Sequence, residues 1–166
     1  MSDPFDGVPT VKSTPESISF TITGNPVSQG SMNQSRTGHM YHRNSAQLNA
    51  WRNQILAGAL QAAHAAGWTL PLDEPVEIWA EFRLKKPGRP KFTEYPAVTP
   101  DLDKLARAVG DALSPTRGHK VLKDDSRIIG WYLHKDYGQP GVTITITRGT
   151  SLRPKRAIWT NQDVPF

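Results

Sequence analysis

The sequence contains no cysteine, which excludes disulfide bonds and zinc sites built from thiolates. No apolar segment approaches the length of about 18 residues that a membrane-spanning helix needs, and no signal-peptide pattern is present. We therefore expect a protein that stays in the cytoplasm of its cell and does not contact the membrane. No internal repeat is visible, and a length of 166 residues favours one domain with a substantial core.

The chain carries a net positive charge. Lys and Arg number 20 against 15 Asp and Glu, which gives a net charge of +5 and a pI near 9.6. If the acidic residues gather at one site, the remaining surface is more basic than this total. Nucleic acid is the natural partner of such a surface, although many basic proteins bind none.

The hydrophobic patterning predicts one α+β domain over residues 18–148, a mixed β-sheet with two helices in the order β-α-β-α-β-β. Apolar residues in alternation or in short runs predict strands over residues 18–23, 76–84, 127–136 and 142–148. We interpret the last two strands as a hairpin around residues 138–141. Apolar spacings of three and four predict helices from Asn44 or Ser45 to Ala66 and over residues 102–113.

Segments without periodicity flank and interrupt these elements. Residues 1–17 are expected to be a flexible N-terminal tail and residues 149–166 a basic C-terminal tail. Residues 27–43 are rich in Gly, Ser and Asn, and we interpret them as a mobile surface loop in which Arg36 and Arg43 are candidate phosphate contacts.

A second loop, residues 85–98, is rich in proline and combines cations with Phe92 and Tyr95. It is either ordinary solvated surface or a phosphate clamp with a stacking platform. The candidate DNA-binding cations of this loop, and of the basic loop that follows the second helix, are Lys85, Lys86, Arg89, Lys91, Lys120 and Lys123.

Five aspartates lie on the second predicted helix and just before the strand that follows it: Asp101, Asp103, Asp111, Asp124 and Asp125. Each has an ordinary structural role open to it, as a helix cap, a solvated helix surface or a turn. Together they suggest a cation, since carboxylates brought close repel one another. An all-oxygen set suits Mg²⁺ or Mn²⁺ rather than zinc. Asp111, two helical turns beyond Asp103, is expected to be structural.

Three short motifs give the chain a family resemblance. They are Pro-Asp-Leu-Asp at 100–103, Asp-Ala-Leu at 111–113, and Asp-Asp-Ser at 124–126 before a strand. At these intervals they resemble the RusA family of Holliday-junction resolvases, small endonucleases often encoded by phages and prophages. The resemblance covers residues 18–148.

This resemblance implies a homodimer that binds four-way DNA junctions and cuts two strands symmetrically with Mg²⁺ or Mn²⁺. It assigns catalysis and metal binding to Asp101, Asp103 and Asp125, with Asp124 as a fourth candidate ligand. The family typically has Asn after Asp-Leu-Asp and a supporting Lys four residues past the second Asp, whereas this chain has Lys104 and Arg107. Either can supply positive charge to a phosphate, but an arginine does not readily transfer a proton.

Two other classes of function remain open on the sequence. One is a metal-dependent nuclease that acts on flaps or single-stranded DNA. The other is a non-catalytic basic DNA-binding module whose aspartates only cap helices and form turns.

Overall fold

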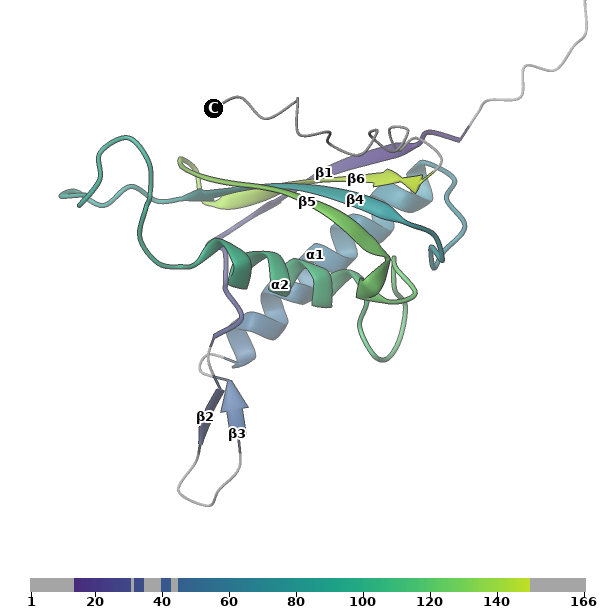
Figure 1. Ribbon diagram of the computed structural model, residues 1–166, viewed down its shortest axis with the longest axis horizontal. Helices are drawn as coiled ribbons and strands as arrows, with labels where there is room; N and C mark the ends of the chain where they lie inside the picture. Colours follow the sequence, from purple (N-terminus) through teal and green to yellow (C-terminus); the bar gives the residue numbers. More distant parts are fainter. Residues whose placement is uncertain (1–13, 31, 35–39, 43–44, 150–166) are drawn as a thin grey trace, which may run out of the picture.

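Four strands form one mixed sheet, and two helices lie together on one of its faces (Figure 1). The computed structural model describes residues 14–30, 32–34, 40–42 and 45–149, with only the backbone of the two short middle segments. The main elements are β1 (Ser17–Thr23), α1 (Ser45–Ala65), β4 (Val76–Leu84), α2 (Leu102–Leu113), the 3-10 turn η1 (Asp125–Arg127), β5 (Ile128–Tyr137) and β6 (Gly141–Arg148). This arrangement confirms the predicted α+β class, the mixed sheet with its two helices, and the order β-α-β-α-β-β.

β4 lies inside the sheet, whose strand order is β1-β6-β4-β5. Its alternating sequence explains this position, because Val76, Ile78, Ala80 and Phe82 are all buried toward the helices. The intervening Trp79 points to the other face and is 55% exposed. β4 pairs antiparallel with β6 and parallel with β5, so it has hydrogen-bonding partners on both sides.

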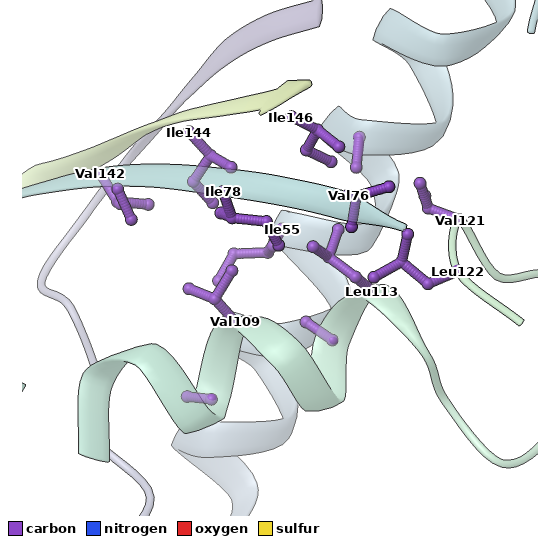
Figure 2. Packing of buried hydrophobic residues seen from close by; sticks show 14 of the residues in the cluster. Ile55, Val76, Ile78, Val109, Leu113, Val121, Leu122, Val142, Ile144 and Ile146 are labelled. Atoms are coloured by element: carbon purple, nitrogen blue, oxygen red, sulfur yellow. The ribbon is translucent and has the colours of Figure 1, made fainter. Parts of the chain in front are cut away.

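The core lies between the sheet and the two helices (Figure 2). Residues from α1, α2 and three strands meet there with no side chain exposed, among them Ile55, Ile78, Val109, Leu113 and Ile144. Each fully buried aliphatic side chain contributes about 1.5–3 kcal/mol of transfer free energy. α2 is therefore fixed by its apolar face, which leaves its polar face free for chemistry.

α1 ends two residues before a glycine. Gly67 has a φ of +73°, the left-handed conformation that side-chain-bearing residues rarely adopt. Its N–H donates to the carbonyl of His64 at 3.0 Å, and the N–H of Trp68 donates to that of Ala63 at 2.9 Å. The chain then turns toward β4.

The predicted hairpin between the last two strands is wrong. β5 and β6 do not pair with each other, because β4 lies between them. The chain from β4 to β5 passes through α2, and such a helical crossover returns the next strand parallel to the first. The turn after β5 therefore spans the end of β4, where the Gly138 N–H donates to the Leu84 carbonyl at 3.0 Å.

The segment interpreted as a loop over residues 27–43 contains a small two-stranded ribbon. β2 (Met32–Gln34) and β3 (Met40–His42) pair antiparallel and extend away from the sheet below the helices (Figure 1). Three-residue strands are too short to give a recognisable alternation, which explains why composition predicted only a loop. Arg36 and Arg43 lie outside the described residues.

The start of the domain is held at two points before β1. The indole N–H of Trp68 donates to the Pro15 carbonyl at 2.7 Å, and the Arg148 N–H donates to the Glu16 carbonyl at 2.9 Å. Most of both predicted tails, residues 1–13 and 150–166, lies outside the described residues. In the part of the chain that the structure describes, no helix is long and apolar enough to cross a membrane.

Candidate active site

A cavity between α2 and the start of β5 brings together two of the predicted aspartates and one of the predicted cations. Its volume is about 360 Å³. The lining residues are Asp103, Ala106, Arg107, Gly110, Asp125, Ile128, Trp131 and Leu133. The two carboxylates and the guanidinium are exposed, whereas the apolar lining residues form a rigid wall that packs on the core.

α2 places Asp103 and Arg107 on this cavity through its own periodicity. The two residues are four apart, so they lie one turn apart on the same helix face. Leu105 and Val109 on the opposite face are fully buried and fix the rotation of the helix. The orientation of the cation relative to the carboxylate thus follows directly from the local sequence.

β5 supplies the wall of the cavity through its register with β4. Trp131 lies beside Ile78 and Leu133 beside Ala80, in a parallel pairing where neighbours share a face of the sheet. Both β4 residues are buried toward the helices. Trp131 and Leu133 therefore point toward α2.

Asp101 occupies the N-cap position of α2 but does not cap it with its side chain. Its backbone is extended, with φ −71° and ψ 140°, and its carbonyl accepts from the Leu105 N–H at 3.1 Å. The carboxylate instead pairs with the Lys104 ammonium at 2.9 Å. The hydrogen bond from Lys104 lowers the pKa of Asp101, and the same contact raises the pKa of Lys104. Neither residue lines the cavity.

The segment that leads into α2 is anchored by Lys135 from β5. Its ammonium donates to the carbonyl of Val98 at 2.5 Å and to that of Pro100 at 3.0 Å. Lys135 also adds an attraction that lowers the pKa of Asp101. Nothing in the local sequence signals this contact, because Lys135 lies on a strand far along the chain.

Asp124 and Asp125 have different roles although they are neighbours. Asp124 caps η1, and its Oδ1 accepts from the Ser126 N–H at 2.9 Å. Hydrogen bonding from Ser126 lowers the pKa of Asp124. The ordinary role of a turn residue thus applies to Asp124, whereas Asp125 begins η1 and lines the cavity.

Asp73 fixes the loop that carries this aspartate pair. Its carboxylate accepts from Lys123 Nζ at 2.7 Å and from Arg127 Nε at 2.8 Å. The Lys123 and Arg127 hydrogen bonds lower the pKa of Asp73. Lys123 is predicted to contact DNA, but in this structure its ammonium is ion-paired with the carboxylate of Asp73. Sequence reasoning missed Asp73 because its partners lie about 50 residues away.

Asp111 is tied to the other helix. Its Oδ2 accepts from Arg52 Nη2 at 2.6 Å, and the same guanidinium nitrogen donates to Gln29 Oε1 at 2.9 Å. The two ion-paired side chains are 23% and 34% exposed, so the pair is partly shielded from water. This contact between α1 and α2 is in line with the structural role expected of Asp111.

The basic loop over residues 85–98 packs back on β5. Lys86 Nζ lies 5.4 Å from the centre of the Tyr137 ring, and the Tyr137 hydroxyl donates to the Phe92 carbonyl at 2.9 Å. Tyr95 meets His134 edge to face at 6.0 Å. The predicted cations of the loop are exposed, and Phe92 and Tyr95 are 43% and 57% exposed. Lys120, in the loop after α2, is half-buried.

The donor set of the cavity fits a divalent cation of the Mg²⁺ type. Within the described ranges no three Asp, Glu or His side chains are grouped closely enough to hold a metal by themselves. Mg²⁺ commonly takes only one or two carboxylates and completes its octahedron with water and substrate phosphate. Asp103 and Asp125 supply that number, and Asp101 lies two residues before Asp103 at the start of the same helix.

Comparison with known proteins gives one family match. Residues 23–147 match the model of a family described as Endodeoxyribonuclease RusA. This span includes β4, α2 and β5 with the whole cavity, and covers well over half of the chain. No curated protein matches the sequence.

Proposed function

Because the chain belongs to the endodeoxyribonuclease RusA family, whose members act on branched DNA junctions, we propose that it resolves Holliday junctions by metal-dependent hydrolysis. The cellular process would be DNA recombination and repair. The observation that carries this proposal is the cavity lined by Asp103 and Arg107 from α2, whose apolar face is buried in the core, and by Asp125 from η1. The basic loop over residues 85–98 would contact the phosphates of the DNA backbone beside this cavity.

Asp103 and Asp125 are the proposed metal ligands. Asp101 can join them if its carboxylate leaves Lys104, a contact that is exposed to solvent and therefore inexpensive to break. Asp124 is the weakest candidate, since one of its oxygens already caps η1. Bound Mg²⁺ or Mn²⁺ would supply an activated water and neutralise charge on the phosphate.

Arg107 takes the proposed role of the supporting cation. It lines the cavity beside Asp103, whereas Lys104 is held by Asp101 outside it. A guanidinium donates two parallel hydrogen bonds to a phosphate and stays protonated at any physiological pH. Arg107 would therefore stabilise the pentavalent phosphate without transferring a proton.

Paired incisions on a junction with two-fold symmetry require two active sites, so we propose a homodimer. The sheet face opposite the helices offers apolar surface for it. Trp79 and Tyr132 stack there with ring centres 4.5 Å apart, and the two residues are 55% and 44% exposed. Trp131, the residue before Tyr132 on β5, lies on the other face of the sheet, where it lines the cavity.

The test is incubation of the purified protein with a synthetic four-way junction, a flap and a single strand, in EDTA and in Mg²⁺ or Mn²⁺. We expect symmetric cutting of the junction, dependent on metal and lost in Asp103→Asn. The matched control is Glu74→Gln, which removes one negative charge that pairs with Arg148 outside the cavity. Preferential cutting of flaps or single strands would contradict the proposed substrate, and no cutting of any DNA would contradict the proposed activity.

A further inference from the structure

A second cavity lies on the other side of the segment that leads into α2. Its volume is about 940 Å³, within the range of roughly 300–1,000 Å³ typical of small-molecule sites. The chain after β1, the first turns of α1, and Thr99 with Pro100 form its walls. Nothing in the mechanism above uses it.

The chemistry of this cavity differs from that of the basic loop. None of the described residues that line it is charged. The lining residues with side-chain amides or hydroxyls are Thr23, Asn25, Ser28, Gln47, Gln54 and Thr99. A phosphate would find no countercharge among these lining residues, but the edge of a nucleobase presents the donors and acceptors that amides pair with.

Apolar surface accompanies these polar groups. Trp51, only 3% exposed, forms part of the wall together with prolines and Val27. Its indole N–H has no hydrogen-bond partner among the described residues. Flat apolar walls with a few amides form the kind of site in which proteins hold bases that have left the helical stack.

The position of the cavity links it to the candidate active site. Pro100 lines the cavity and the next residue is Asp101. The Gln29 N–H donates to the Lys104 carbonyl at 3.1 Å, so the segment that follows β1 is attached directly to the first turn of α2. DNA whose phosphate lies at Asp103 and Asp125 would therefore pass close to this cavity.

We propose that this cavity receives an unstacked nucleobase next to the cleaved phosphate, and that Gln47 and Gln54 read its edge. This inference rests on the proposed function, because it requires DNA at the active site. A branch point supplies such a base at low cost, since pairing and stacking are already weakened there. The cavity would thereby give the enzyme a preference for sequence at the cut.

The test is a binding cycle that needs no cleavage. Fluorescent four-way junctions, each with a single abasic site at one position near the crossover, are titrated with the protein in EDTA. For wild type we expect binding about ten-fold weaker at one position, a typical contribution of one well-placed base. The variant Gln47→Ala/Gln54→Ala should bind intact DNA more weakly and should not respond to the abasic site at that position.

The matched control is Gln61→Ala, the same residue type further along α1 and outside this cavity. It should respond to the abasic site as wild type does. The inference is overturned if no abasic position weakens wild-type binding, or if the abasic site weakens binding of the double variant as much as that of wild type. Cleavage assays are separate: junction cutting without any abasic response refutes the base site alone, and an abasic response without cutting refutes the nuclease alone.

Discussion

Replacing Arg107 gives the sharpest test of the proposed mechanism. The guanidinium lines the cavity one helical turn from Asp103 and would donate to the phosphate as its charge grows. A hydrogen bond to a charged group contributes about 1.5–3 kcal/mol, which corresponds to about 10- to 150-fold in rate. Arg107→Met should lose this amount in the single-turnover rate. Arg107→Lys keeps the charge but not the paired hydrogen bonds, so we expect it to stay within about ten-fold of wild type.

The measurement separates chemistry from binding. Single-turnover cleavage of a four-way junction gives the rate at saturating protein, and fluorescence anisotropy in EDTA gives the dissociation constant. The control Arg148→Met removes a guanidinium that is ion-paired to Glu74 outside the cavity, so its single-turnover rate should stay within about three-fold of wild type. A normal rate in Arg107→Met, or a loss confined to the dissociation constant, would refute the assigned role.

Four further outcomes are expected. In thermal melts, Mn²⁺ should raise the melting temperature of wild type but not of Asp103→Asn; an equal rise in both would exclude Asp103 as a ligand. Neutralising the four cations of residues 85–91 should make junction binding less dependent on salt. The slope of log K against log salt concentration should fall by about 0.9 for each phosphate that the loop no longer binds, and an unchanged slope would show that the loop does not contact DNA. Trp79→Ser should shift light scattering from dimer to monomer if the outer sheet face pairs two copies, and a persistent dimer would exclude that face. Asp111→Ala should lower the free energy of unfolding in urea by about 1–2 kcal/mol, because the partly buried Arg52 loses its carboxylate partner and keeps only Gln29; no change would show that the ion pair does not stabilise the fold.

The ion pairs around the cavity also set a pH dependence. The pKa of Asp73 is lowered by the hydrogen bonds from Lys123 and Arg127. A carboxyl whose folded pKa lies below its unfolded value adds stability above the unfolded pKa and loses it as the pH falls through the folded one. The loop that carries Asp125 should therefore loosen only in acid, at a pH below the ordinary range of an aspartate.

Much of the fold follows from patterns that a short stretch of chain contains. The alternation in β4 and the three–four spacing in α2 each describe one element packed by one face. The same periodicity places Asp103 and Arg107 on one side of a helix, since residues four apart must share a face. The acidic motifs that resemble the RusA family are likewise a property of the sequence.

Tertiary structure alone decided how these elements meet. Whether β5 pairs with β6 or with β4 depends on hydrogen bonds between segments distant in the chain, which no local period encodes. The same holds for Asp125 beside α2, for Asp73 with Lys123, and for the cavity that joins Pro100 to the segment after β1. Local sequence fixes which face of an element is apolar, but the choice of partner for that face is made by packing of the whole core.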